Sequence, residues 1–263
     1  MKKALITGGS TGLGASFVSH LNEEGYQVFA TSRNASGILN PIKGVVYLDL
    51  ELGDSGKIKS WVSNFKDKFG TPDLLINNAG YGAYFQIIDF PKQEIEIQLS
   101  VMLQSPIFLC KYFASSMALK EGACIVNVSS LAAQFPLPYM SVYNSAKAGL
   151  GAFSRSLMLE YSDQELQIID FRPGDFKTRF NKVLNKSLDS NEKLDRVWCL
   201  LEKHLDQSPD VSLASRDLLK AIRLGRSGIF YSGDFFQAKL GPLFYKLAPE
   251  ALIQWFLRLY YKI

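Results

Sequence analysis

Short apolar runs alternate with longer, partly polar stretches along most of the 263 residues. The apolar runs have the length of strands, and the longer stretches repeat apolar residues at helical spacing. Strands are predicted at 3–7, 27–32, 44–50, 73–80, 123–130 and 166–174. Several of them are continuously apolar, as in a parallel sheet that is covered on both faces. The pattern therefore predicts a doubly wound α/β sheet with right-handed crossovers, built as one domain over residues 1–263.

Turn-forming residues mark the ends of the predicted helices. Helices are expected up to Glu24 and over 58–70, 141–161 and 208–225. In the last of these, Ser208 is the expected N-cap, Pro209 the first helical residue and Gly225 the residue after the end. Residues 175–208 are more polar and show no clear strand, so we expect an insertion of helix and loop over the sheet.

The composition excludes several classes of protein. Hydrophobic residues make up 47% of the chain, which is ample for one buried core. The net charge is only +4, and no run of Lys and Arg is long enough to predict nucleic-acid binding. The two histidines, His20 and His204, lack metal-ligand spacing, so no metal site is expected.

The cysteines and the apolar runs bear on the compartment. Cys110, Cys124 and Cys199 have apolar neighbours in the sequence, which suits a reducing compartment better than a disulfide framework. The apolar run after Lys3 is too short for a secretion signal, and no stretch approaches the ~18 apolar residues of a spanning helix. We therefore expect a cytoplasmic protein.

Two turns that follow predicted strands have the composition of nucleotide-binding turns. Thr7–Gly14 (TGGSTGLG) follows the first strand and opens the first helix. Its glycines let the backbone approach a pyrophosphate, whose charge is met by free N–H groups at the helix N-terminus. Asn77–Gly80 (NNAG) ends the fourth strand, at the edge where ligands of open α/β sheets bind. Their positions together favour a dinucleotide site.

These turns are the first two of five elements that occur in a fixed order. The set is Thr7–Gly14 (T-G-x-x-x-G-x-G), Asn77–Gly80, Ser130, Tyr143 with Lys147, and Pro173–Gly174 followed by Thr178. In this set the chain resembles the short-chain dehydrogenase/reductase family in its compact form, over about residues 3–178. The resemblance implies a Rossmann-like fold, homo-oligomers, and hydride transfer between nicotinamide and a carbonyl or hydroxyl carbon.

The resemblance assigns Ser130, Tyr143 and Lys147 as the catalytic residues. Tyr143 and Lys147 are four residues apart on a predicted helix and so share one face. A free tyrosine has a pKa near ~10. A neighbouring ammonium and a positively charged nicotinamide are expected to lower the pKa of Tyr143 and make it an acid–base group. Ser130 is expected to offer its hydroxyl to the substrate oxygen on which negative charge develops.

The end of the second strand predicts which cofactor is bound. An acidic residue there would bind the ribose 2′-OH and repel a 2′-phosphate, but this chain has Ser32 and Arg33. A guanidinium beside a hydroxyl can bind a phosphate, so we expect NADP(H) rather than NAD(H) unless Arg33 is only a solvated loop residue. By resemblance, Asp49 contacts the adenine. The full set of expected cofactor-binding residues is Thr7, Gly8, Ser10, Thr11, Gly12, Leu13, Gly14, Ser32, Arg33, Asp49, Leu50, Asn78, Ala79, Gly80, Tyr143, Lys147, Pro173, Gly174 and Thr178.

One position departs from the family pattern. An asparagine that helps to hold a water of the family's proton relay falls on Met102, and a thioether cannot donate a hydrogen bond. One hypothesis is an active enzyme whose relay is weakened or rerouted through Ser100 or Gln104. The alternatives are that Met102 is simply a core residue, or that the chain is a low-activity NADP(H)-binding sensor or scaffold.

The segments expected over the nicotinamide, including the 175–208 insertion on the substrate side, predict a lipophilic carbonyl or alcohol substrate. A mostly apolar cleft suits such a compound, and no cluster of arginines points to a polyanion. The aromatic and aliphatic residues concerned are Tyr81, Tyr84, Phe85, Phe135, Leu137, Tyr139, Phe176 and Phe180. Some of these rings are expected to be plain core.

The tail 249–263 has the pattern of a very apolar helix. Glu250, Gln254, Arg258 and Lys262 recur every four residues and form one narrow polar strip. The remaining side chains must be buried, cover a subunit interface, or lie on a membrane surface. The sequence leaves these three alternatives open.

Overall fold

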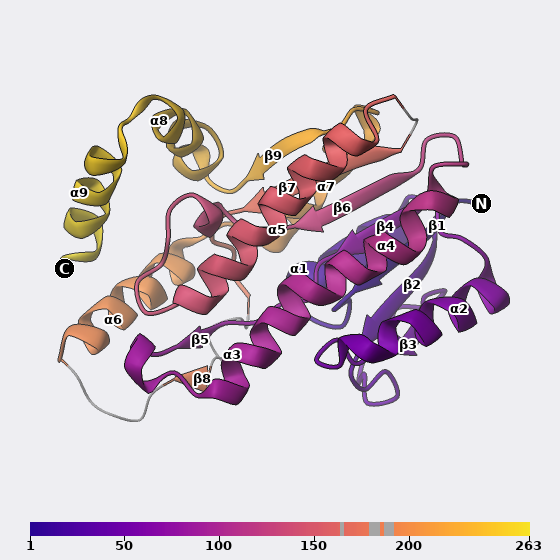
Figure 1. Cartoon of the computed structure of the whole chain (residues 1–263), viewed down its shortest axis with the longest axis horizontal. Coiled ribbons are helices and arrows are strands. Elements are labelled where there is room, and N and C mark those ends of the chain that lie inside the picture. Colours follow the sequence, from indigo (N-terminus) through magenta and orange to yellow (C-terminus); the bar gives the residue numbers. More distant parts are fainter. Residues whose placement is uncertain (164–165, 179–184, 187–191) are drawn as a thin grey trace.

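Seven parallel strands form the centre of the computed structural model, which describes residues 1–163, 166–178, 185–186 and 192–263. Their order across the sheet is β3-β2-β1-β4-β6-β7-β9 (Figure 1). The strands are β1 (Lys3–Thr7), β2 (Gln27–Ser32), β3 (Val46–Asp49), β4 (Leu74–Asn77), β6 (Cys124–Val128), β7 (Gln167–Pro173) and β9 (Gly228–Ser232). The predicted doubly wound parallel sheet is confirmed. The sequence pattern missed β9, a partly exposed strand at the edge of this sheet that pairs with β7.

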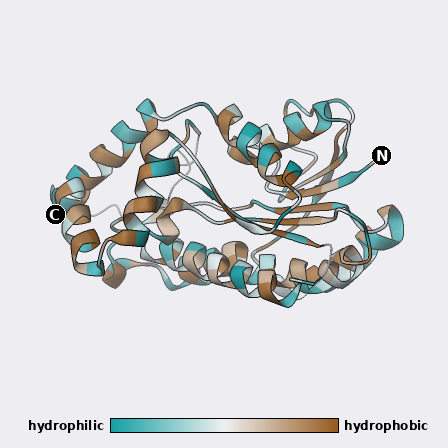
Figure 2. Ribbon diagram, turned by 90° about the horizontal axis from the view of Figure 1, so that it is seen from above, coloured by the Kyte–Doolittle hydropathy of each residue, from teal (hydrophilic) through white to brown (hydrophobic). Residues whose placement is uncertain are grey.

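Helices cover both faces of this sheet, as the view from above shows (Figure 2). One face packs against α1 (Gly12–Glu23) and α7 (Val211–Arg223). The other packs against α2 (Ile58–Phe69), α4 (Ser105–Met117) and α5 (Ser141–Glu160). Neighbouring residues of one strand therefore belong to different cores, which explains why the central strands are apolar at every position.

The start of α7 differs from the prediction. Its N-cap is Asp210, whose carboxylate accepts the Ser212 N–H at 2.9 Å. Ser208 instead donates its hydroxyl to the His204 carbonyl at 2.7 Å, so it closes the preceding helix, and Pro209 lies before the cap. The predicted end is confirmed, because Gly225 follows the helix with a φ of +63°.

The 175–208 segment contributes a helix, α6 (Glu192–Gln207), and a short strand that the sequence did not predict. This strand, β8 (Asn185–Lys186), pairs in parallel with β5 (Ala83–Tyr84). A two-residue strand depends on its distant partner and leaves no pattern of its own. The Cys199 side chain is exposed on α6, in contrast to the apolar surroundings expected for it.

Two further helices, α8 (Gly241–Leu247) and α9 (Glu250–Tyr261), gather with α6 beyond the ends of β6, β7 and β9 (Figure 1). One face of α9 is buried through Ile253, Leu257 and Tyr261. The opposite face exposes other apolar residues, including Trp255. Burial in the protein therefore explains the apolar residues on one face of α9 but not those on the opposite face. No helix in the described ranges is both long and apolar enough to cross a bilayer.

Candidate active site

The turns after β1 and β4 touch at the carboxyl edge of the sheet. Gly8 has a φ of +66°, and a Cβ placed on it would lie 2.8 Å from the Ala79 Cα. A Cβ on Gly14 would lie 2.1 Å from the Gly8 carbonyl oxygen. Asn78 fastens the two turns by donating its side-chain amide to the Thr7 carbonyl at 3.0 Å. Only glycine fits at these two positions, because the contact is backbone against backbone.

Thr7 supports this edge from behind. Its hydroxyl oxygen accepts the backbone N–H groups of Asn78 at 3.0 Å and Ala79 at 3.1 Å. Thr7 does not line the cavity, so the structure places it as a positioning residue for the second turn. At the start of α1, the N-cap Thr11 makes no side-chain cap bond, which leaves first-turn N–H groups available to an anion.

A cavity of about 860 Å³ runs from this edge to the C-terminal helices. It is lined by every predicted site residue except Thr7 and Asp49, namely Gly8, Ser10, Thr11, Gly12, Leu13, Gly14, Ser32, Arg33, Leu50, Asn78, Ala79, Gly80, Ser130, Tyr143, Lys147, Pro173, Gly174 and Thr178. Asp49 is the last residue of β3, and its carboxylate turns to the neighbouring loop after β2, where it accepts the Ala35 N–H at 2.6 Å. The free backbone groups and the glycine cradle fit a dinucleotide.

Ser32 and Arg33 lie at the nucleotide end of this cavity. The Ser32 hydroxyl accepts the Asn34 N–H at 3.2 Å, which holds the loop in a tight turn. Arg33 is exposed and forms no hydrogen bond or ion pair with any other described residue. Its guanidinium is therefore not committed to a partner in that part of the chain.

Ser130, Tyr143 and Lys147 meet in the middle of the cavity. Ser130 follows β6 and caps the short turn Leu131–Ala133 by accepting the Ala132 N–H at 3.0 Å. Tyr143 and Lys147 project from α5 and are both buried. The Lys147 ammonium donates to the Val128 carbonyl at 2.8 Å and lies 5.9 Å from the centre of the Tyr143 ring.

Burial is the largest influence on the pKa values of Tyr143 and Lys147, the two site residues on α5. It raises the pKa of Tyr143 to about 12; the hydrogen bond with Ser130 acts in the opposite direction and the charge of Asp175 adds to the rise. In the protein side chains by themselves, this pKa is therefore raised. The lowering predicted from the sequence also counted the positive charge of a bound nicotinamide, so it stays a prediction. Burial lowers the pKa of Lys147 to about 8, opposed by the negative charge of Asp170.

Met102 lies in a π-helical turn, Ser100–Gln104, between α3 (Lys92–Leu99) and α4. It is fully buried, and its sulfur and the Lys147 ammonium both border Gly80: a Cβ there would lie 3.3 and 3.4 Å from them. Ser100 donates its hydroxyl to the Leu52 carbonyl at 3.0 Å, and Gln104 is exposed. The structure gives no support to a relay rerouted through either residue. It supports Met102 as a core residue.

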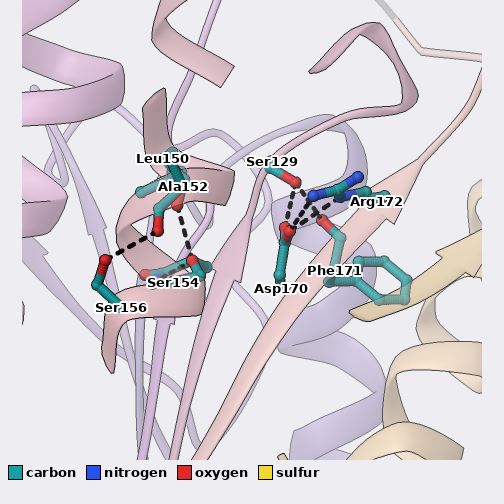
Figure 3. Close-up of polar contacts among 9 residues, drawn as sticks. Ser129, Leu150, Ala152, Ser154, Ser156, Asp170, Phe171 and Arg172 are labelled. Carbon is teal, nitrogen blue, oxygen red and sulfur yellow. Dashed lines mark hydrogen bonds and ion pairs between the residues drawn. The ribbon is translucent and has the colours of Figure 1, made fainter. Parts of the chain in front are cut away.

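A buried ion pair, which the sequence did not predict as part of the site, lies behind these residues. Arg172 donates to one Asp170 oxygen through Nε at 2.8 Å and through Nη2 at 2.6 Å. Figure 3 shows Ser129 and Arg172 converging on Asp170. Asp170 and Arg172 both lie on β7, whereas Ser129 directly follows β6. The bond that Ser129 donates to Asp170 therefore links the end of β6 to β7, next to Ser130. The sequence did offer a signal for this pair, because Asp170 and Arg172 are two charged residues within the otherwise apolar strand 166–174.

The far end of the cavity is mainly aromatic and aliphatic. Of the aromatic and aliphatic side chains predicted there, Tyr81, Phe135, Leu137 and Phe176 line it, whereas Tyr84, Phe85 and Tyr139 do not. Phe180 lies outside the described residues. The sequence missed further lining residues from α6 to α9: Leu201, Leu205, Phe236, Gln237, Phe244, Phe256, Leu257, Tyr260 and Tyr261. It also missed Asp175, although an acid directly after Gly174 was visible.

No metal-binding cluster occurs among the described side chains.

Comparison with known proteins agrees with this geometry. The family model described as short chain dehydrogenase matches residues 2–189. The chain belongs to the short-chain dehydrogenase/reductase family. It is an NAD(P)-dependent oxidoreductase of that family, as the sequence motifs predicted.

Two relatives and one solved structure illustrate the similarity. A 3-ketodihydrosphingosine reductase of Bacteroides thetaiotaomicron is 26% identical over 98% of this chain and 97% of its own length. A probable short-chain type dehydrogenase/reductase, VdlC, of Helicobacter pylori is 31% identical over 75% of this chain and 72% of its own. A short-chain dehydrogenase from Streptomyces avermitilis has the same fold, with a TM-score of 0.80 at 21% identity and 94% coverage of both chains.

Replacing Lys147 by Met should stabilise the cofactor-free protein at neutral pH. A pKa lowered from 10.5 to about 8 means that the ammonium costs about 3 kcal/mol in the folded chain below pH 8. Loss of the bond to Val128 offsets about 1 kcal/mol of this. We expect a net gain in the free energy of unfolding of about 2 kcal/mol at pH 7, measured by urea denaturation.

The gain should depend on pH in a defined direction. Between pH 8 and 10.5 the unfolded wild type binds more protons than the folded one, so its stability rises and its deficit relative to Lys147→Met shrinks. The exposed Lys43→Met variant should show no such trend. Equal gains from Lys147→Met at pH 7 and pH 10 would contradict the assignment of a buried charge.

Proposed function

We propose that this protein is an NADP(H)-dependent reductase of lipophilic ketones. One observation carries the proposal: a single cavity joins the glycine cradle to an apolar chamber, and Ser130, Tyr143 and Lys147 lie where the two halves meet. A substrate carbonyl in the apolar half would meet these three side chains. The retention of all three in one buried cluster favours turnover over a sensor or scaffold role.

The nucleotide half of the cavity suits a cofactor that carries a 2′-phosphate. When bound, the nicotinamide cofactor supplies the hydride. The α1 N-terminus would bind the pyrophosphate, and Arg33, which is not paired within the described chain, would bind the 2′-phosphate. Ser32 replaces the acidic side chain that would repel this group.

The protonation of the site favours reduction at neutral pH. Because burial raises the pKa of Tyr143 to about 12, its hydroxyl keeps a proton that it can donate to the substrate oxygen. Ser130 would donate a second hydrogen bond to the same oxygen. The Lys147 ammonium, fixed on the Val128 carbonyl, would hold positive charge near the phenol as the proton leaves.

The chamber beyond Tyr143 supports a lipophilic substrate. Its walls include Phe135, Leu137, Phe244 and Leu257, and side chains of this kind exclude water from the reacting carbonyl. The Bacteroides relative, similar over almost its whole length, is named a reductase of a 3-keto compound, which supports a ketone as the reacting group.

Tyr143→Phe tests the chemistry. Removing the proton donor should lower kcat for a long-chain ketone by about 100- to 10,000-fold, with NADPH binding retained. NADPH oxidation at 340 nm and NADPH fluorescence titration measure the two quantities. Tyr47→Phe, a tyrosine outside the cavity lining, is the matched control and should keep wild-type turnover. Unchanged turnover in Tyr143→Phe would refute the proposed role, and tight NADPH binding without wild-type turnover would favour the sensor alternative.

Arg33→Leu tests the cofactor preference. Loss of charge-assisted bonds to a phosphate should raise the KM for NADPH by about 10- to 100-fold and leave that for NADH nearly unchanged. Arg155→Leu removes an exposed arginine of α5 that does not line the cavity, and it should change neither value. Parallel losses with both cofactors in Arg33→Leu would show that Arg33 does not read the 2′-phosphate.

We also propose that the exposed face of the C-terminal helices, called here the α8–α9 face, lies on an anionic bilayer surface. Its large exposed apolar residues that do not line the cavity are Phe235, Leu240, Leu243, Leu247, Leu252, Trp255, Leu259 and Ile263. Four basic residues, Lys239, Lys246, Arg258 and Lys262, accompany them against one acid, Glu250. This mixture of aromatic, aliphatic and basic groups is typical of interfacial helices. The same α9 lines the cavity through its inner face, so a lipophilic substrate would have a short route from the bilayer.

Vesicle binding tests this surface. The protein should co-sediment with phosphatidylcholine vesicles that contain phosphatidylserine, and at least tenfold more weakly with phosphatidylcholine alone. Trp255→Ser with Leu259→Ser should weaken binding at least tenfold, because each apolar side chain buried is worth about 1.5–3 kcal/mol. Leu119→Ser, an exposed leucine of the loop after α4, is the control. Self-association without lipid that is lost in the double variant would assign the α8–α9 face to a second copy, in line with the homo-oligomer expected from the resemblance.

A further inference from the structure

One carboxylate lines the cavity close enough to Tyr143 for its charge to act on the phenol. Asp175 directly follows Gly174 at the end of β7 and lines the cavity wall. The other acidic lining residues, Glu51 and Glu94, lie toward the nucleotide end, where both act on Tyr81 together with Arg33. Asp175 is thus the acidic group among the described side chains that faces the proposed substrate.

Gln237 holds Asp175 in a fixed orientation. The Gln237 amide N–H donates to the Asp175 carboxylate at 2.8 Å, and its carbonyl oxygen accepts the Asp175 backbone N–H at 3.0 Å. This two-point contact joins the end of β7 to the π-helical turn Phe236–Leu240. A neutral amide satisfies part of the hydrogen-bonding capacity of the carboxylate and leaves its charge uncompensated.

The negative charge of Asp175 reaches the catalytic centre. It raises the pKa of the Tyr143 phenol, and it acts in the same direction on Tyr260 at the far wall. Burial raises the pKa of the Asp175 carboxyl; the Gln237 hydrogen bond and His204 on α6 oppose the rise, and the charge of Asp234 adds to it. Within the described chain no lysine or arginine forms an ion pair with Asp175. An uncompensated carboxylate here opposes the negative charge that develops on the substrate oxygen during reduction.

We infer that Asp175 binds a cationic group, such as a protonated amine, that a lipophilic substrate carries close to its carbonyl. The inference rests on the proposed function. An ammonium placed in an apolar chamber needs a carboxylate partner, and Asp175 is preoriented to provide one. Pairing would also cancel the charge that opposes the reaction at Tyr143. A neutral ketone of equal chain length would leave Asp175 buried without a partner, so the site would select for the amine.

The test compares two ketones that differ only in the amine. The wild type would be assayed with NADPH on a long-chain 2-aminoalkan-3-one and on the alkan-3-one of the same length. We expect kcat/KM to favour the amino ketone by at least tenfold, and this ratio to fall close to one in Asp175→Asn. Asp67→Asn is the matched control: Asp67 is an exposed acid of α2 that does not line the cavity. It should keep the wild-type ratio.

The possible failures are distinguishable. No turnover of either ketone by the wild type would overturn the proposed function. Equal turnover of both, or a ratio that survives in Asp175→Asn, would overturn the inference alone. A change in Asp175→Asn confined to the KM for NADPH would assign Asp175 to the cofactor and also overturn it. If Asp175→Asn does not fold, inhibition of the wild type decides: dodecylamine should inhibit at least tenfold more tightly than dodecanol, and equal inhibition contradicts the inference.

Discussion

The backbone contact between the turns after β1 and β4 is the constraint on which the site depends. Neighbouring parallel strands whose connections leave in opposite directions open a crevice at their carboxyl edge. Gly8 and Gly14 allow the two turns to close on each other, and Asn78 bonds them together. Once this contact forms, the N-terminus of α1 and the end of β4 face one cavity. The remaining site residues are placed relative to that edge.

Buried charges at the same site lower the stability of the folded protein. Lys147 is a buried cation that donates to the Val128 carbonyl, and Asp170 is a buried anion paired with Arg172, two residues further along the same strand, β7. Each charge removed from water is expensive unless it is paired and hydrogen-bonded. The fold tolerates them because rigid parallel strands fix their partners. The free energy gained by burying the apolar cores on both sheet faces offsets this cost. As a result, the Lys147 ammonium is held beside the Tyr143 phenol.

The C-terminal region supplies the apolar part of the cavity lining. Helices α6, α8 and α9 build the apolar chamber, and Gln237 from the same region orients Asp175. These elements lie far from the glycine turns in sequence, and the motifs that define the family do not extend to them. The apolar lining and the glycine cradle therefore come from separate parts of the chain, although both border the cavity that Tyr143 lines.

The sequence by itself determined the parallel sheet and the two glycine turns, and through the family resemblance its ordered motifs indicated Ser130, Tyr143 and Lys147 as the expected catalytic residues. Those features depend on local patterns: continuous apolar runs, glycines after strands, and two side chains one helical turn apart. The tertiary structure decided what depends on distant contacts. It placed β9 at an edge, capped α7 with Asp210, directed Asp49 to the loop after β2, and left one face of α9 exposed. It also set the direction of the Tyr143 pKa, because burial is a property of the packed cavity that no sequence spacing encodes.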